Sequence, residues 1–221
     1  MGIKNAELKR RIITLSYKLK LSHIGSNLIM VDTLVDIYKK KKPEDMVILS
    51  NAHAHLAHLI VMDAMLSSNR LFQESDDWVM DIEKRIKDFG IHCDRKAGCD
   101  ASGGSLGHGI GIALGMALAD PRRRVYCTIS DGECAEGSAW ESLRIQKERY
   151  VENLNVYAII NGWGAYHEIN PTKLSNQLEY MSWAIPVFCS LWQYPEWLQG
   201  QEAHYGVLDK ARYDELMKLL R

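Results

Sequence analysis

The chain has 221 residues, of which 47% are hydrophobic and 25% charged, and its formal net charge is −1 at pH 7. These values are typical of a globular protein with a substantial core, so we expect one domain over residues 1–221. The near-neutral charge gives no reason to expect nucleic acid or an anionic membrane as a partner, and no apolar run is long enough to span a bilayer. Five irregularly spaced cysteines and a polar N-terminus predict reduced thiols in a cytoplasmic protein.

The first 60 residues read as two helices, a strand and the start of a third helix. Apolar side chains recur with a helical period over residues 5–20, and a second helix is expected from about Met30 to Lys40. Residues 22–27 read as a polar turn between them. The run 46–49 predicts a strand that ends at Ser50, and His53 opens the following helix, where a side chain projects into the crevice at the strand ends of an open α/β sheet.

The next stretch holds histidines and cysteines whose role the residues alone leave open. Residues 63–88 read as helices with a break near Asp76 and Asp77. His55 and His58 are expected to face solvent or to line the helix, and a metal site that combines them with His53 is the lesser alternative. A zinc site at residues 92–99 is also the lesser alternative, because no second Cys/His pair has finger-like spacing.

A glycine-rich loop spans residues 100–109, with the sequence Asp-Ala-Ser-Gly-Gly-Ser-Leu-Gly-His-Gly. Small and apolar residues from Ile110 to Ala119 predict a buried crossover helix after it. Glycines let the backbone approach a phosphate closely, and a helix start presents unpaired N–H groups to it. A plain turn is the alternative for a loop of this kind taken by itself.

Two further strands each end on an oxygen-bearing side chain. The apolar run from Val125 ends at Ser130 before Asp131, and the run from Val156 to Ile160 ends before Asn161. Parallel strands in one βαβ unit bring their carboxyl ends to one edge of the sheet. A hard cation that holds a diphosphate needs oxygen ligands at such an edge. Its protein ligands are expected to be the side chains of Asp131 and Asn161 and the carbonyl of Trp163.

This spacing is that of the thiamine diphosphate motif, in which Asp-Gly is followed about thirty residues later by Asn. The longer pattern Asp131-Gly-Glu-x-x-Glu136-Gly-x-x-Trp140-Glu141 resembles the transketolase family, as do residues 46–54 and 100–109. The resemblance implies a three-layer α/β/α domain with a mainly parallel sheet, of the pyrophosphate-binding type. It also implies thiamine diphosphate and Mg²⁺, or Ca²⁺, as cofactors.

The resemblance carries roles onto particular residues of this chain. The cofactor-binding positions are Gly104, Leu106, Asp131, Gly132, Glu133 and Asn161, and the metal ligands are Asp131, Asn161 and Trp163. The catalytic positions are His23, His53, His92, His204 and Glu136. The histidines are expected around the thiazolium, the diphosphate and the substrate hydroxyls. Glu136 belongs to a carboxylate cluster that links two active sites across a subunit interface, although a helix N-terminal carboxylate explains it equally well.

The chain departs from the family pattern at Ile24, Ala52, Ser130 and Ile160. Ala52 stands where the family has glycine, and it would strain the turn if that position required a positive φ. Positions 130 and 160 supply no cation ligand in the family, so we expect the cation site to survive.

Beyond Asn161 the resemblance weakens. The remaining segment looks too short for a complete strand-helix-strand extension, so a trimmed sheet edge is expected on the C-terminal side. Its aromatic residues either form a partner-facing patch or pack against the sheet; they include Trp183, Trp192, Tyr194 and Trp197.

The resemblance covers only the first third of a full-length transketolase, since no residues are left for a pyrimidine-binding domain. It therefore implies the N-terminal subunit of a split transketolase, active only with a separate pyrimidine-binding subunit in a homodimer or heterotetramer. The reaction would move a two-carbon ketol unit from a ketose phosphate to an aldose. A non-catalytic binding remnant, or a split enzyme that acts on a different modified sugar, is the alternative.

Overall fold

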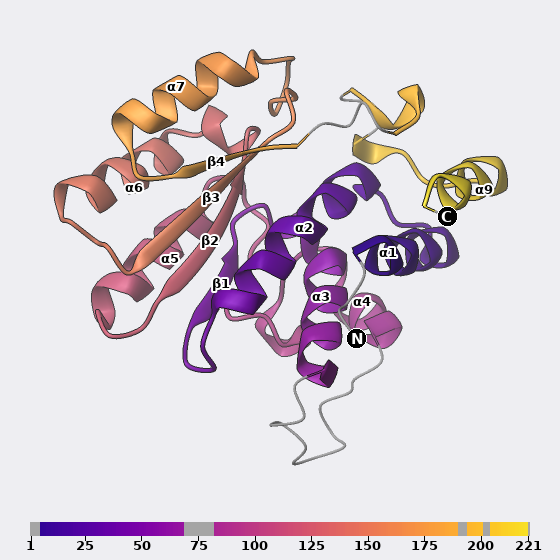
Figure 1. Ribbon diagram of the computed structural model, residues 1–221, viewed down its shortest axis with the longest axis horizontal. Coiled ribbons are helices and arrows are strands. Elements are labelled where there is room, and N and C mark those ends of the chain that lie inside the picture. The colour runs from indigo at the N-terminus through magenta and orange to yellow at the C-terminus, as the bar shows by residue number, and fades with distance from the viewer. Residues whose placement is uncertain (1–4, 69–81, 190–193, 201–203, 221) are drawn as a thin grey trace. The chain divides into compact units, whose positions relative to one another are not determined.

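The computed structural model describes residues 5–68, 82–189, 194–200 and 204–220 (Figure 1). They fall into two compact units, one formed by residues 1–40, 53–91 and 191–221 and the other by residues 41–52 and 92–190. A single domain over the whole chain therefore stays a prediction. Within the described ranges, no helix is long and apolar enough to cross a membrane.

The first unit is helical. Its helices are α1 (Asn5–Leu19), α2 (Ile24–Lys40), α3 (His55–Ser68), α4 (Ile82–Phe89) and α9 (Lys210–Leu219). Helix α1 packs against α2, α3 and α9, and α3 also packs against α2 and α4. The apolar stripe of α1 explains this packing, because its side chains Leu8, Ile12 and Ile13 are buried.

Helix α2 begins at Ile24, so the polar turn expected over residues 22–27 is shorter than predicted. Ile24 and Leu28 are buried and continue the apolar face of the helix toward its start. Asn27 is buried as well, and its side-chain amide bonds to backbone groups of neighbouring segments. These contacts satisfy a polar side chain that the sequence alone assigns to a turn.

The second unit holds a parallel sheet, as the sequence predicts, and the sheet has four strands. Its strands are β1 (Met46–Leu49), β2 (Val125–Ser130), β3 (Leu154–Ile160) and β4 (Ile185–Phe188), paired in the order β1-β2-β3-β4. Met46 pairs with Val125, Val125 with Leu154, and Tyr157 with Ile185. The crossovers are α5 (Gly109–Ala119), α6 (Gly137–Glu148) and α7 (Pro171–Met181).

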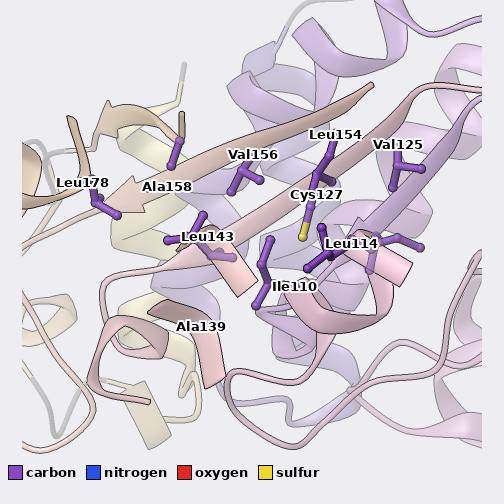
Figure 2. Packing of buried hydrophobic residues seen from close by; sticks show 14 of the residues in the cluster. Ile110, Leu114, Val125, Cys127, Ala139, Leu143, Leu154, Val156, Ala158 and Leu178 are labelled. Atoms are coloured by element: carbon purple, nitrogen blue, oxygen red, sulfur yellow. The ribbon is translucent and has the colours of Figure 1, made fainter. Parts of the chain in front are cut away.

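The three crossover helices and one face of the sheet share a hydrophobic core (Figure 2). Cys127 of β2 and Val156 of β3 belong to the same buried cluster as Ile110 of α5, Leu143 of α6 and Leu178 of α7. Burial of these side chains is the main force that fixes the helices on the sheet. The packed sheet therefore supports the loops that follow its strands.

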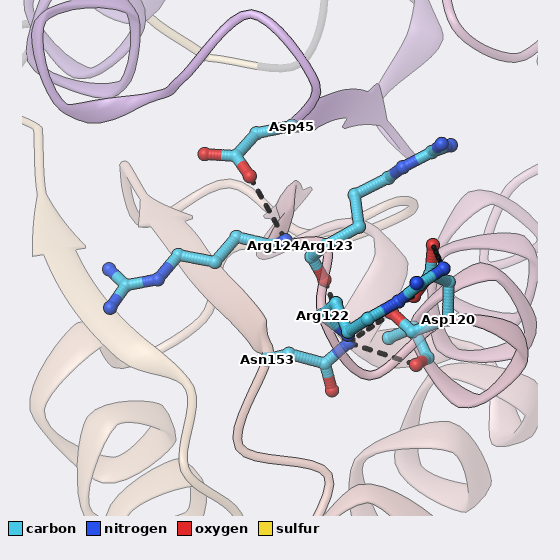
Figure 3. A network of polar contacts seen from close by, with 7 residues as sticks. Asp45, Asp120, Arg122, Arg123, Arg124 and Asn153 are labelled. Atoms are coloured by element: carbon cyan, nitrogen blue, oxygen red, sulfur yellow. Dashed lines mark hydrogen bonds and ion pairs between the residues drawn. The ribbon is translucent and has the colours of Figure 1, made fainter.

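At the amino ends of the strands, a polar network closes the turn between α5 and β2 (Figure 3). The side-chain amide of Asn153 donates to the carbonyls of Ala117, Asp120 and Arg123 at 2.9, 3.2 and 2.9 Å. Asp45 accepts the N–H of Arg124 at 3.0 Å. This network anchors the end of the sheet opposite the predicted site, so it has a structural role.

The segment after Asn161 is long enough for one helix and one short strand, and a trimmed edge beyond them stays a prediction. It forms α7 and then β4, which pairs with β3 and closes the sheet on that side. Pro171 at the start of α7 and the Asn170 cap, which accepts the N–H of Lys173 at 3.0 Å, let this helix begin without a longer linker. The short strand then needs only four residues.

The aromatic residues of the C-terminal region do not form one class. In the second unit, the side chain of Trp183 is 38% exposed and lies near Tyr150, with 5.9 Å between the ring centroids. In the first unit, Tyr194 is buried, and the indole of Trp197 donates to Glu215 at 2.7 Å. Trp192 lies outside the described residues.

Candidate functional site

Asp131 and Asn161 lie together at the carboxyl end of the sheet, as their positions after β2 and β3 predict. The N–H groups of Asn161 and Gly162 donate to one oxygen of the Asp131 carboxylate at 2.8 and 2.9 Å. The N–H of Gly132 donates to the other oxygen at 3.1 Å, and Asn161 Oδ1 accepts the N–H of Trp163 at 2.8 Å. We call Asp131, Asn161 and Trp163 the strand-end site.

The Asp131 carboxylate is buried, with an exposed fraction of 4%. Burial raises the pKa of Asp131 to about 6, while the N–H groups of Asn161, Gly162, Gly132 and Trp163 act to lower it. A nearby cation would stabilise the ionised form further. A carboxylate, an amide oxygen and a backbone carbonyl are the donors that Mg²⁺ and Ca²⁺ prefer, so the donor set fits a hard cation.

The glycine-rich loop before α5 depends on its glycines at defined points. Gly107 has a φ of +74°, and a Cβ there would lie 2.7 Å from both Glu136 Cβ and Ser138 Oγ. A Cβ on Gly109 would lie 2.4 Å from Ser50 Cα. The backbone therefore packs more closely than any side chain would allow. The start of α5 follows directly, and its first N–H groups suit a phosphate.

His92 and Leu106 flank the exposed part of this loop. His92 is exposed, and a Cβ on Gly104 would lie 3.7 Å from its ring atom Cγ. Leu106 is half-buried. The structure thus places His92 next to Gly104. The resemblance assigns a role to both residues.

Glu133 is fully buried and its carboxylate is held by donors of the same unit. One oxygen accepts the Ser50 hydroxyl and the N–H of Gly107, the latter at 3.1 Å. The other accepts the N–H of Ser130 at 3.1 Å. Burial raises the pKa of Glu133 to about 7, against the opposing effect of these three donors. Ser50 was not among the predicted site residues, although it ends the predicted strand.

Glu136 occupies the N-cap position of α6, without a capping hydrogen bond from its side chain. Its backbone is extended, its N–H donates to the carbonyl of Glu133 at 2.9 Å, and its side chain is half-buried against Gly107. Helix α6 starts at Gly137, before the Trp140-Glu141 pair. A carboxylate at this point is favoured by the helix dipole, and its role at a subunit interface stays a prediction.

The departures from the family pattern leave the strand-end site intact. Ala52 is not among the non-glycine residues with positive φ, so alanine strains no turn there. Its Cβ lies 2.9 Å from where a Cβ on Gly103 would stand, so the two positions together fill that space. Ile160 is buried in the core and Ser130 contributes its backbone N–H.

In the first unit, three of the predicted histidines meet. The ring centroid of His23 lies 5.1 Å from that of His53 and 4.2 Å from that of His204, and His53 and His204 are 5.1 Å apart. The N–H of His23 donates to the carbonyl of His204 at 2.9 Å. We call His23, His53 and His204 the histidine cluster. The sequence could not show this meeting, because the three turns lie far apart along the chain.

The turn at His23 is strained, since its φ is +62°. This left-handed conformation is rare for a residue with a Cβ. Its Nδ1 lies 2.6 Å from the Ser22 hydroxyl. Burial lowers the pKa of His204, because it disfavours the charged imidazolium.

Asn27 ties the histidine cluster together and was not predicted as a site residue. Its Nδ2 donates to the carbonyls of His23 and His53 at 2.9 and 3.2 Å, and its Oδ1 accepts the N–H of Ala57 at 2.8 Å. The available signal was a lone amide on the apolar stretch of α2. A buried polar side chain needs such partners, so its position there indicates a structural link.

Two further histidines, His55 and His58, lie on α3. His55 and His58 are buried, which contradicts the expectation that they face solvent. His55 Nδ1 lies 3.3 Å from the carbonyl of Gly90, and His58 Nε2 lies 2.8 Å from the Tyr38 hydroxyl. All five cysteines are thiols, as predicted. Asp76 and Asp77 lie outside the described residues.

Comparison with known proteins identifies the family. Residues 4–181 match the family model described as 1-deoxy-D-xylulose-5-phosphate synthase. The chain is 30% identical over 152 residues to a transketolase from Pongo abelii, a match that covers 64% of this chain and 23% of that protein. It is 24% identical over 168 residues to a protein of Phocaeicola vulgatus that is named as one subunit of an apulose-4-phosphate transketolase, covering 70% of this chain and 58% of that protein.

The fold agrees with this match. The chain superimposes on the transketolase from Leishmania mexicana with a TM-score of 0.59 at 18% sequence identity, covering 82% of this chain and 31% of that one. The chain thus spans about a quarter to a third of these transketolases. It belongs to the transketolase family, in which it corresponds to the N-terminal thiamine diphosphate-binding domain.

Proposed function

We propose that this chain is the N-terminal subunit of a split, thiamine diphosphate-dependent transketolase that works with a separate pyrimidine-binding subunit. The complex transfers a two-carbon ketol unit from a ketose phosphate to an aldose. The observation that carries the proposal is the strand-end site, in which the buried Asp131 carboxylate bonds to the turn of Asn161 and Trp163 at the carboxyl edge of a parallel sheet.

The residues of the strand-end site hold the cation. Asp131, Asn161 and the carbonyl of Trp163 are its proposed ligands, with Mg²⁺ or Ca²⁺ as the ion. Asp131 is fixed for this task because three backbone N–H groups orient its two oxygens. The loop with Gly104 and Leu106 and the turn with Gly132 are the proposed diphosphate-binding segments.

The histidines are the proposed groups for proton transfer. Thiamine diphosphate, when bound, supplies the electron sink for breaking and forming the carbon–carbon bond. Burial lowers the pKa of His204 and so favours its neutral form, which is the form of an imidazole that acts as a base. His23 and His53 adjoin it in the histidine cluster. His92, which is exposed beside Gly104, is proposed to bind substrate hydroxyls.

A companion chain is part of the proposal. The relative from Phocaeicola vulgatus is itself named as one subunit of its enzyme, which supports a division of the activity between two chains. Helix α5 also supports an assembly, because its sequence holds no polar side chain and yet Ile112 and Leu118 are 38% and 50% exposed. A homodimer of this chain, or a heterotetramer with Glu136 near the interface between subunits, would cover such a face.

A split enzyme that acts on a different modified sugar is the second candidate. It is favoured by the name of the same relative, which includes apulose 4-phosphate. A non-catalytic binding remnant is less well supported, since the departures at Ala52, Ser130 and Ile160 leave the strand-end site in place.

The test is to mix the purified chain with its companion chain, thiamine diphosphate and Mg²⁺, and to follow ketol transfer with several sugar phosphates. We expect activity only in the mixture, and none with Asp131→Ala. The matched control is Asp36→Ala, which removes an exposed carboxylate paired with Lys40. Activity of this chain alone would contradict a split enzyme, and cofactor binding without turnover on any sugar would favour the remnant.

A further inference from the structure

Glu133 is singled out by the resemblance as a cofactor-binding residue, but its surroundings leave no space for such a contact. Its exposed fraction is 0%, so no atom of the side chain faces the space that a ligand would fill. Three donors of the chain itself already occupy its carboxylate oxygens, namely the Ser50 hydroxyl and the N–H groups of Gly107 and Ser130. A buried carboxylate is retained only when it is bound in this way.

The three donors come from three different segments. Ser50 follows β1, Gly107 lies in the loop before α5, and Ser130 is the last residue of β2. One carboxylate therefore fixes the ends of two strands and the glycine-rich loop relative to one another. The hydrophobic core holds each strand in place, whereas Glu133 bonds to both strand ends and to the loop.

Ser50 extends this arrangement to the helix start. Its hydroxyl donates to Glu133 and its oxygen accepts the N–H of Ile110 at 3.1 Å. Gly109 packs directly on it, since a Cβ there would lie 2.4 Å from Ser50 Cα. The orientation of the first turn of α5 thus depends on where the Glu133 carboxylate holds the Ser50 hydroxyl.

We infer that Glu133 is a positioning residue, which sets the glycine-rich loop and the first turn of α5 in the geometry that receives a diphosphate and does not touch the cofactor itself. This inference rests on the proposed function for the identity of the ligand. It also explains why serine is accepted at position 130, because the contact there uses the backbone N–H.

The test compares Glu133→Gln with the wild type in the full chain. Glutamine has nearly the same shape, but one acceptor oxygen becomes an NH₂ group that meets a donor N–H. The matched control is Glu148→Gln, the same change at an exposed carboxylate on α6 that pairs with Arg144. Ser50→Ala is the second variant, since it keeps the carboxylate and removes the link to Ile110.

Two measurements separate positioning from a general loss of structure. Hydrogen exchange in the chain without cofactor should become at least tenfold faster at the amides of Gly107 and Ile110 in Glu133→Gln, and remain unchanged at the core amides of β2 and β3. In the mixture with the companion chain, the KM for thiamine diphosphate should rise at least tenfold while kcat at saturating cofactor changes less than twofold. Ser50→Ala should speed exchange at Ile110 and raise the KM in the same way, and Glu148→Gln should do neither.

Exchange at Gly107 and Ile110 equal to that of the wild type would overturn the inference, as would faster exchange throughout the sheet. An unchanged KM for thiamine diphosphate would overturn it as well. A wild-type chain that binds no thiamine diphosphate, even with its companion, would contradict the proposed function instead. The exchange measurement decides the positioning role in either case.

Discussion

The strand-end site and the histidine cluster are held in place by different means. At the strand-end site, each functional side chain closely follows a strand, and the parallel pairing of β2 with β3 sets the distance between Asp131 and Asn161. In the histidine cluster, the side chains come from three turns far apart in the chain. Backbone bonds and one buried amide, that of Asn27, hold these turns together.

The difference predicts which substitutions should disturb each site. The strand-end site is supported by a buried hydrophobic core, so changes in its loops should act locally. The histidine cluster depends on a few polar contacts and on one strained backbone conformation, so single substitutions there should affect both its geometry and its stability. Four variants test this contrast, from the largest expected effect to the smallest.

Gly107→Ala should lower the free energy of unfolding by about 2–4 kcal/mol. The cost of positive φ and the overpacking against Glu136 and Ser138 contribute about 1–2 kcal/mol each. The matched control is Gly115→Ala in α5, where a Cβ would meet nothing within 4 Å. It should stabilise the chain by about 0.5–1 kcal/mol. Urea unfolding of both variants measures the difference, and equal effects would contradict the close packing at Gly107.

Asn27→Ala should destabilise the first unit by about 1–3 kcal/mol, because it removes the side-chain hydrogen bonds to two carbonyls and one N–H. Asn176→Ala, on the exposed face of α7, should change stability by less than about 0.5 kcal/mol. Thermal unfolding and the NMR chemical shifts of the histidine rings report the effect. Unchanged ring shifts at His23 and His53 would show that Asn27 does not hold the histidine cluster.

His23→Gly should be more stable than His23→Ala by about 1 kcal/mol, since glycine adopts positive φ without steric cost. Both variants lose the same imidazole, so the comparison isolates the backbone strain. Denaturant unfolding of the pair measures it. If alanine were tolerated as well as glycine, the left-handed conformation at this position would be in doubt.

Asp131 should make the stability of the isolated chain depend on pH. Its pKa in the folded state is about 6, above the ordinary value of 3.8, so the protonated form favours folding. This contribution is fully present below pH 3.8 and is lost as the pH rises through 6. Relative to Asp131→Asn, the wild type should therefore lose about 1 kcal/mol of stability between about pH 5 and pH 8. Thermal unfolding at several pH values checks the sign, and a loss toward low pH would contradict it.

The sequence predicted most of what is local. Apolar runs placed β1 to β3, and the Asp131 and Asn161 positions followed from the ends of β2 and β3. The strand β4 was missed because Pro186 interrupts its apolar run, and proline is atypical of a strand interior. The start of α2 was missed because Asn27 is polar but buried.

The site was predicted less completely than the fold. The meeting of His23 with His204 depends on tertiary contacts over about 180 positions, which no periodicity reveals. The burial of His55 and His58 was also missed, since a histidine on a helix has no pattern that separates a core position from a solvent-facing one. The bonding of Ser50 to Glu133 required the packed sheet, because the two residues are 83 positions apart.

The edge strand β4 limits the pairing of further strands with the sheet. The N–H of Cys189 points to β3, where it donates to the carbonyl of Ile160 at 2.9 Å. Alternate residues of a strand direct their N–H groups to the same side, so the N–H groups at positions 186 and 188 belong to the outer side. Position 186 is proline and has no such group, so another chain that docked there would find an interrupted ladder. Pro186 makes this strand hard to recognise in the sequence. It therefore also opposes the addition of strands from other chains at this edge of the sheet, which is a route to fibrous aggregation.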